Sequence, residues 1–330
     1  KTSLILGGNP FNINLLVNHN NVQNDLYNNY KLDYISTQDN DHRRIYNNHT
    51  EHNTTIDALI YYGYKYFKND KYDGVFTPYI AFNHTYGNLS HPYYRLERMQ
   101  QWSDALDWTK GSLGVLPDGE WQSICFDNEN SYYSTEKKQT GSAGLRLSHK
   151  LTGLKRGNIQ FDVDLGAVLQ YKRLDYQRNE RSYDIDRHAY SFRPTLKVDY
   201  HSNSKHKWVP ELNLNYTGEH QQPNLLNMLQ VEDNADPLNL FRGNASLLGE
   251  YAHRLAFRYG MSQRKIQHDA YVSLQYVRTH NDIVASSIYN AENGGRIYEM
   301  VNTNRTHAAN GEVGYSLPLD KKKNFFITLS

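Results

Sequence analysis

The stretch Asn158–Lys172, NIQFDVDLGAVLQYK, decides the fold class. Apolar and polar residues alternate along it from Ile159 to Tyr171, which is the pattern of a β-strand with one apolar face. Strands in soluble proteins are commonly about 5–6 residues long, whereas crossing a bilayer at a tilt takes about 9–11 residues. The stretch is therefore long enough to span a membrane. In that case the lipid-facing residues are Ile159, Phe161, Val163, Leu165, Ala167 and Leu169, and the interior-facing ones include Asp162 and Asp164.

The same alternation recurs along most of the chain. It predicts strands near 10–19, 55–68, 75–87, 141–151, 158–173, 188–200, 207–217, 251–261, 267–281 and 304–317, and another that starts at 325. Because both ends of the sequence lie inside strand patterns, we expect an internal fragment, so that the missing signal peptide carries no information about compartment. Residues 1–330 are predicted to be part of a single all-β domain.

The connections between these strands alternate in length. The short ones are 69–74, 152–157, 201–206, 262–266 and 318–324, and the long ones are 20–54, 88–140, 174–187, 218–250 and 282–303. An antiparallel up-and-down transmembrane β-barrel has this arrangement, with short periplasmic turns at one end and long extracellular loops at the other. We therefore predict part of an outer-membrane β-barrel. A soluble β-barrel or sandwich with its apolar face turned inward gives the same period of two and remains the alternative fold.

Composition agrees with a barrel. The net charge of +1 gives no reason to expect nucleic acid as a partner. Only 38% of residues are apolar and the mean hydropathy is −0.80, yet the chain has 28 Tyr and 11 Phe. Barrel strands need apolar residues only at alternate positions, and tyrosines near strand ends form the girdles at the membrane surfaces. Cys125 is the single cysteine, which excludes a disulfide framework.

The segment Pro223–Tyr259, PNLLNMLQVEDNADPLNLFRGNASLLGEYAHRLAFRY, joins a turn-rich loop to an alternating strand. It resembles the signature of TonB-dependent-receptor-like outer-membrane β-barrels of Bacteroidetes type. Ala245 and Gly249 depart from that pattern, because the family usually has Pro at both places. The two turn pairs are expected to supply turn geometry and positive φ. The matching loop residues are Pro223, Asp236, Pro237, Gly243, Asn244 and Glu250.

The resemblance implies a barrel of about 22 strands in the bacterial outer membrane, an N-terminal plug and energised uptake of a bulky nutrient such as a glycan or siderophore. Its implied partners are outer-membrane lipid, that nutrient and a TonB-type energy-coupling protein, which would act through a plug that this sequence lacks. Two rival functions stay open. One is a passive porin or adhesion barrel, and the other is a soluble all-β binding module.

The sequence carries no catalytic signature and indicates no cofactor. It has no G-x-S-x-G, H-E-x-x-H, P-loop or G-x-G-x-x-G motif, so we expect no enzyme. Possible metal ligands cluster at His49, Glu51 and His52 and again at Asp184, Asp186 and His188. Because both clusters fall in or beside predicted loops, where such residues are commonly solvated, no metal site is predicted.

Aromatic residues concentrate in the predicted loop 88–140. Leu96, Met99, Trp102 and Leu106 follow helical spacing, which predicts a short helix. Two interpretations are open: a private core that keeps the loop folded, or exposed rings that bind ligand at the extracellular mouth. The candidate ligand-binding residues are Trp102, Trp108, Trp121, Tyr132 and Tyr133.

Overall fold

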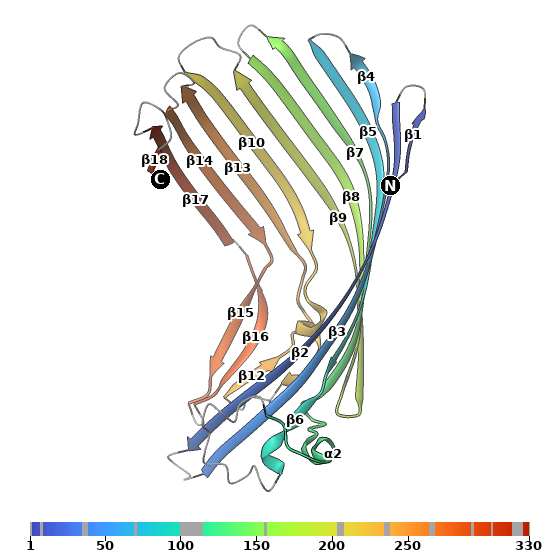
Figure 1. Ribbon diagram of the computed structural model, residues 1–330, viewed down its shortest axis with the longest axis vertical. Coiled ribbons are helices and arrows are strands. Elements are labelled where there is room, and N and C mark those ends of the chain that lie inside the picture. The colour runs from blue at the N-terminus through green and yellow to red at the C-terminus, as the bar shows by residue number, and fades with distance from the viewer. Residues whose placement is uncertain are drawn as a thin grey trace.

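The chain forms a long curved sheet, shown in the computed structural model of Figure 1. The structure describes residues 2–6, 9–34, 39–68, 71–99, 115–154, 157–202, 208–233, 238–263, 268–291, 294–304, 306–318 and 326–329. The strands of the main sheet are β1 (Thr2–Leu6), β2 (Asn9–Tyr34), β3 (Asp39–Tyr62), β4 (Tyr64–Lys68), β5 (Tyr72–His91), β6 (Tyr93–Arg95), β7 (Tyr132–Leu154), β8 (Gly157–Arg178), β9 (Arg181–Ser202), β10 (Val209–Gln221), β13 (Glu250–Gln263), β14 (His268–His280), β17 (Thr306–Pro318) and β18 (Phe326–Leu329). Within the described ranges, no helix is long and apolar enough to cross a membrane.

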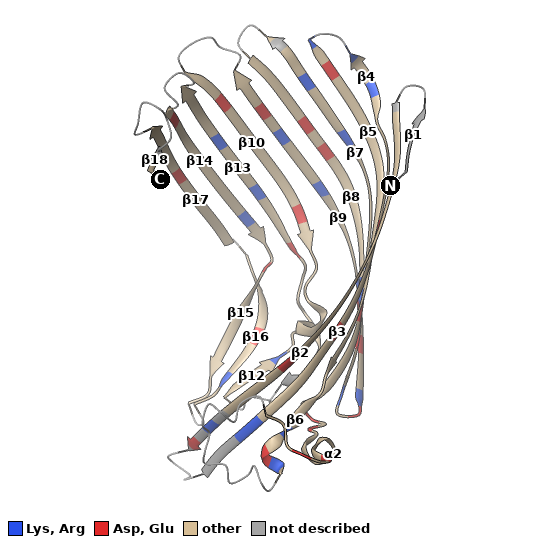
Figure 2. Cartoon of the chain, viewed as in Figure 1, with Lys and Arg blue, Asp and Glu red and all other residues tan. Residues whose placement is uncertain are grey.

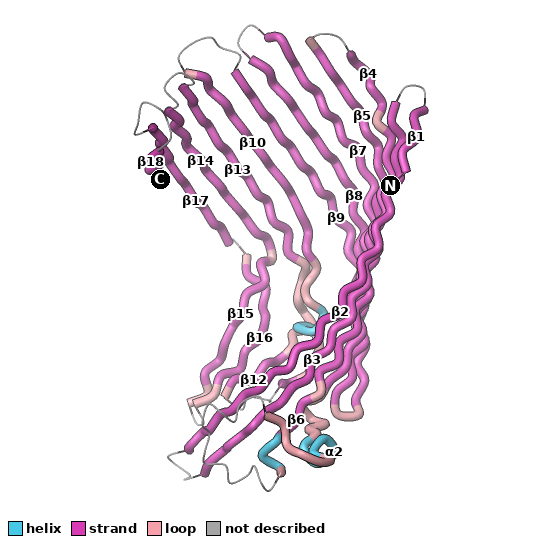
Figure 3. The backbone as a smooth tube through the Cα atoms, viewed as in Figure 1, coloured by secondary structure: helices cyan, strands magenta, loops and turns pink. Residues whose placement is uncertain are grey.

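The main sheet runs up and down. Its order is β1-β2-β3-β5-β7-β8-β9-β10-β13-β14-β17-β18, with β4 and β6 attached to β5 and β3, and neighbouring strands are antiparallel. Its two edge strands, β1 and β18, do not pair with each other in the described part of the chain. The predicted partial up-and-down barrel is thus confirmed, and Figure 3 shows how much of the chain is strand.

The expected strands are all present, but the boundaries of several were wrong. The strand predicted near 10–19 is the much longer β2, and 20–54 is mostly β2 and β3, which pair from Phe11–Tyr62 to Tyr34–Asp39. The predicted loop 174–187 is the tip of the β8–β9 hairpin, turned by Asn179 and Glu180 at φ of 47° and 61°. Paired φ values above zero are typical of the tight turns that match strand twist. Strands continue past the apolar alternation because backbone pairing does not require it.

Two more predicted loops contain regular structure. Between the end of β5 and the start of β7, the described part of the 88–140 segment holds β6, the 3-10 turn η1 (Leu96–Arg98) and the short helix α2 (Trp121–Cys125). The helix expected from Leu96 to Leu106 is therefore only a 3-10 turn where it is described, and the rest lies outside the described residues. The segment 282–303 is a hairpin of β15 (Asp282–Tyr289) and β16 (Arg296–Thr303).

This hairpin belongs to a second, small sheet. β16 pairs in parallel with β12 (Asn239–Arg242), which in turn pairs with β11 (Glu232–Asp233), so the order is β11-β12-β16-β15. Two expected loops, 218–250 and 282–303, thus bind each other. The strand ends that flank the connections expected to be long lie at one end of the main sheet, which we call the loop end. The strand ends that flank the connections expected to be short lie at the other, which we call the turn end (Figure 1).

The main sheet has one apolar and one polar face. Leu165 of β8 lies opposite Leu145 of β7 and Pro194 of β9, and the side chains on this face are open to the surroundings. Leu165 is 45% exposed, Leu169 54% and Ile80 64%. We call this the outer face. A soluble module would bury these side chains against protein, so that alternative does not hold.

The opposite, inner face is polar. Asp164 of β8 accepts hydrogen bonds from the Tyr79 hydroxyl at 2.8 Å and from Arg146 at 3.0 Å. Beside it a polar cavity of about 420 Å³ is lined by residues that include Asp162, Thr195 and Lys197. Figure 2 shows that charges of both signs recur along the strands. Alternation therefore places Asp162 and Asp164 on the inner face, as expected from the sequence.

The Tyr251 side chain makes a hydrogen bond to β9 where the pairing of β9 with β10 has ended. The last residue pair of that ladder is Thr195–Thr217, while Pro194 still pairs with Leu165 of β8. A Cβ at the next residue of β10, Gly218, would lie 2.5 Å from the Tyr251 hydroxyl. Glycine therefore leaves room for Tyr251 to reach across from β13 and donate to the Phe192 carbonyl at 2.8 Å.

Candidate functional site

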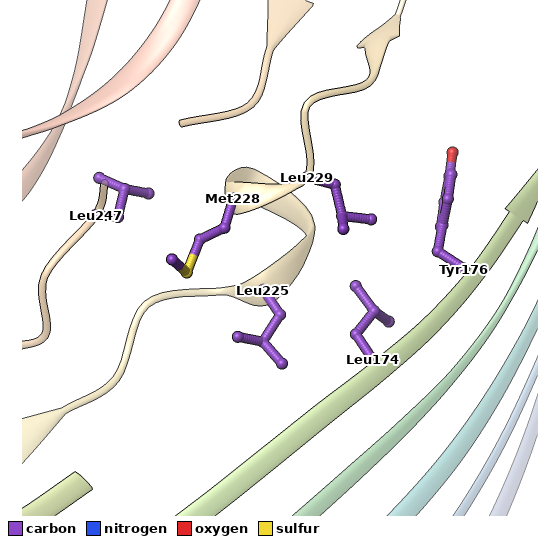
Figure 4. Close-up of a cluster of buried hydrophobic side chains, with 6 residues drawn as sticks. All are labelled: Leu174, Tyr176, Leu225, Met228, Leu229 and Leu247. Carbon is purple, nitrogen blue, oxygen red and sulfur yellow. The ribbon is translucent and has the colours of Figure 1, made fainter. Parts of the chain in front are cut away.

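The described parts of the segment 222–249, residues 222–233 and 238–249, pack against the inner face near the loop end. The turn η3 (Leu225–Met228) of this segment contributes Leu225 and Met228, which are 0% and 1% exposed. They form a hydrophobic cluster with side chains of β8 and the rest of the segment (Figure 4): Leu174, Tyr176, Leu229 and Leu247. Burying a large apolar side chain contributes about 1.5–3 kcal/mol. The segment is therefore held in place by a core of its own inside the curve of the sheet.

Hydrogen bonds fix the two ends of this segment. Lys172 of β8 donates to the carbonyls of Gln222 and Pro223 at 3.2 and 3.3 Å. At the other end the Asn244 amide donates to the Met300 carbonyl at 2.9 Å, and Asn302 exchanges hydrogen bonds with the backbone of Leu248. The signature residues Pro223 and Asn244 thus anchor the segment to β8 and β16.

Gly243 allows a close backbone approach. A Cβ at this position would lie 1.6 Å from the carbonyl oxygen of Leu229, so no other residue fits without moving the chain. Its φ is not positive, and neither is that of Asn244, which corrects the expectation drawn from the sequence. Glu250 begins β13 and accepts from the Ile283 backbone at 3.5 Å. Asp236 and Pro237 lie outside the described residues.

Trp121 belongs to a different cluster. It is 7% exposed and packs with Tyr46, Leu96 and Cys125, with its ring centred 5.0 Å from that of Tyr94. This packing is what the private-core interpretation of the 88–140 segment expects. Burial raises the pKa of the Cys125 thiol, and the nearby Glu97 carboxylate adds to the shift. A raised pKa leaves less of the reactive thiolate at neutral pH. Trp102 and Trp108 lie outside the described residues.

An aromatic ladder crosses the inner face at the loop end. Successive ring centroids are 5.5 Å apart for His49–His91, 4.7 Å for His91–Tyr132, 5.4 Å for Tyr132–Tyr176 and 6.3 Å for Tyr176–Tyr183. The five rings come from β3, β5, β7, β8 and β9 respectively. Such spacings are those of stacked and edge-on ring pairs. The ladder forms a continuous aromatic wall beside the 222–249 segment.

A pocket of about 250 Å³ lies between this wall and the small sheet, and we call it the mouth pocket. The wall contributes Tyr132 and Tyr176, and the small sheet contributes Phe241 and Tyr298, whose rings are 5.3 Å apart. Arg242 and Glu299, paired in the parallel ladder, add charges of both signs. The remaining lining residues are Arg178, Leu226, Asn227, Val231, Gly243, Ala285 and Met300.

Tyr133 does not join this pocket. Consecutive strand residues point to opposite faces, and Tyr133 is 46% exposed in a wider, polar groove of about 720 Å³, which is also lined by His52, Arg173 and Asp184. The sequence placed Tyr132 and Tyr133 in one candidate ligand site. In the structure they line two different pockets on opposite faces of the sheet.

The possible metal ligands noted in the sequence were not expected to form a metal site, and the structure places His49 and His188 in other contacts. In the parts of the chain that the structure describes, no group of three or more His, Cys, Asp or Glu side chains could hold a metal ion. His49 instead contacts His91, with their Nδ1 atoms 3.2 Å apart. His188 stacks on Tyr171 at 4.7 Å between ring centroids.

Sequence reasoning missed most of the mouth pocket. Tyr176, Phe241 and Tyr298 fall in predicted loops, where no period assigns a side chain to a face. The available signal was the concentration of aromatic residues at the ends of the long connections. It identified Tyr132 but could not show which loops meet.

A comparison with protein families agrees with the fold. A model described as outer membrane protein beta-barrel family matches residues 152–330. No curated protein matches the chain.

Among solved structures, the hemophore receptor HasR of Serratia marcescens is 12% identical, with a TM-score of 0.33, and 94% of this chain covers 58% of that one. The ferric enterobactin receptor PfeA of Pseudomonas aeruginosa is 10% identical, with a TM-score of 0.35 and coverage of 84% and 49%. The outer membrane transporter YddB of Escherichia coli is 12% identical, with a TM-score of 0.33 and coverage of 96% and 51%. The chain thus spans about half to three fifths of the length of these proteins.

Proposed function

Because the chain belongs to the outer membrane protein beta-barrel family and lies in the bacterial outer membrane, we propose that it is the barrel part of a receptor that captures a bulky solute at its extracellular mouth and imports it. The observation that carries this proposal is the mouth pocket. It lies on the inner face at the loop end, which is the extracellular end of such barrels.

The pocket has the chemistry of a recognition site for ringed solutes. Aromatic rings bury large areas at low entropic cost, and binding sites are enriched in them. Tyr132, Tyr176, Phe241 and Tyr298 supply rings from two sides, and Arg242 and Glu299 supply polar contacts. A siderophore or a glycan offers the matching combination of ring faces and polar groups. This favours transport or binding over catalysis.

The family resemblance extends the proposal to energy coupling. Receptors of the TonB-dependent type carry a plug, and through it a TonB-type protein drives uptake. A passive porin or adhesion barrel lacks that dependence. Deleting the energy-coupling protein from the host therefore separates the two: it abolishes uptake by a receptor and leaves diffusion through a porin unchanged.

The Tyr132–Tyr133 pair tests the pocket. In the full-length protein, Tyr132→Ala should weaken binding by about 1–3 kcal/mol, which is a factor of about 5 to 150, because it removes a ring from the wall of the mouth pocket. Tyr133→Ala, its neighbour on the other face, should leave binding unchanged. Fluorescence titration with ferric enterobactin, haem and maltoheptaose measures the affinity. Failure of all three probes to bind, or an effect confined to Tyr133→Ala, contradicts the proposal.

A further inference from the structure

The outer face carries tyrosine–histidine pairs on neighbouring strands. Towards the loop end the Tyr216 hydroxyl lies 2.8 Å from Nδ1 of His253, and the Tyr276 hydroxyl lies 2.9 Å from Nδ1 of His307. Towards the turn end, Tyr66 pairs with His149 at 3.0 Å. Between the two levels lie the exposed apolar side chains of the outer face. These pairs therefore mark the two girdles of the membrane-embedded zone.

One place in the loop-end girdle is hollowed. A pocket of about 320 Å³ on the outer face is lined by Tyr216, His253, Leu255, Tyr276, Arg278 and His280. On the side of the pocket away from the loop end, Leu255 is followed on the same face by Phe257, which lies opposite Leu274 in the apolar zone. Arg278 and His280 lie on the other side of Tyr276, towards the loop end. The exposed lining of the pocket is mostly apolar, and its two residues nearest the loop end, Arg278 and His280, are basic.

Its charge is one-sided. No carboxylate lines it, and Arg278 forms no ion pair with any residue that the structure describes. By contrast, Arg254 follows His253, the residue that pairs with Arg278, and so lies on the inner face. It forms an ion pair with Glu219 at 3.3 Å. Figure 2 shows blue bands on both β13 and β14, and alternation sends those of β13 inward and Arg278 outward.

From this arrangement we propose that the pocket binds the phosphate of an anionic lipid of the outer leaflet. The lipid phosphate accepts from the Arg278 guanidinium, with the tyrosine hydroxyls and imidazoles as further partners, and the acyl chains lie along Leu255 and Phe257. Basic pockets at the membrane surface recognise lipid headgroups in this way, and charge-assisted hydrogen bonds to phosphate are strong. The site is on the opposite face of the sheet from the mouth pocket, so it stands independently of the import proposal.

The test is lipid binding by the full-length protein in neutral detergent, followed by native mass spectrometry. The probe is lipid A, a glycolipid with two phosphates, and dephosphorylated lipid A is the comparison. We expect lipid A to bind more tightly, and Arg278→Gln to weaken that binding about tenfold, as expected for the loss of a charged hydrogen bond. Arg278→Lys should retain part of the affinity.

Arg254→Gln is the matched control, since it removes an arginine at the same level from the inner face; it should not change lipid A binding. Equal binding of the two lipids, an unaffected Arg278→Gln variant or an equal loss in Arg254→Gln would each overturn the proposal. Competition by millimolar inorganic phosphate would show a site for small anions and would also contradict a lipid site.

Discussion

Replacing Leu165 with Arg should destabilise the barrel by about 2–4 kcal/mol, the cost of an arginine facing lipid near the bilayer midplane. Leu165 is 45% exposed on the outer face and lies midway between Ile159 and Tyr171 in β8. Arginine at this depth must displace lipid contacts or draw water and headgroups towards it. Denaturant titration of the full-length protein folded into lipid vesicles measures the change in the free energy of unfolding.

The matched control is Thr195→Arg in the neighbouring strand. Thr195 lies opposite Asp164 on the inner face and lines the polar cavity with Asp162. The cavity is lined by carboxylates and by basic side chains, among them Arg146 and Arg193, so an arginine meets charges of both signs and we expect a change within about 1 kcal/mol. Asp164 itself is unsuitable, because its replacement removes the partner of Tyr79 and Arg146. Equal losses in the two arginine variants would refute the assignment of the faces.

Truncating Leu225 to Ala should release the 222–249 segment from the sheet. Leu225 is 0% exposed and packs against β8, so its loss costs about 2–5 kcal/mol through reduced burial and the cavity left behind. Because the main sheet is held by its own ladders, this cost should appear as local opening. Limited proteolysis should then cut within 222–249, while the barrel stays folded in vesicles.

Leu226→Ala is the control for this prediction. Leu226 is the next residue, but it is 39% exposed, so its truncation should leave the protease resistance of the segment unchanged. If Leu225→Ala remains as resistant as the parent protein, the hydrophobic cluster is not what holds the segment.

The sequence predicted the sheet well because lipid imposes a strict rule on it. Wherever strands such as β8 cross the apolar zone, every second residue must be apolar, and that pattern can be recognised in the sequence. Outside the apolar zone the residues need not alternate, so the sequence does not show where a strand ends. The Asn-rich part of β2 pairs with β3 over its whole length although its composition resembles a loop.

The candidate site was less predictable for a related reason. The mouth pocket joins Tyr132 of β7 to Phe241 and Tyr298, residues far apart in the chain that meet only through the parallel pairing of β12 and β16. No local pattern encodes that contact. The family signature located the 222–249 segment, but not the partner that completes the pocket.

The topology of the barrel is tested most directly by cysteine labelling of intact cells with a membrane-impermeant maleimide. The parent protein serves as the unlabelled control, because its single cysteine, Cys125, is 0% exposed. Asp118→Cys and Arg181→Cys, at exposed positions of the loop end, should label; Lys71→Cys, in an exposed turn-end bend, should label only after the outer membrane is permeabilised. Labelling of Lys71→Cys on intact cells, or its absence at both loop-end positions, would contradict an outer-membrane barrel whose long connections face outward.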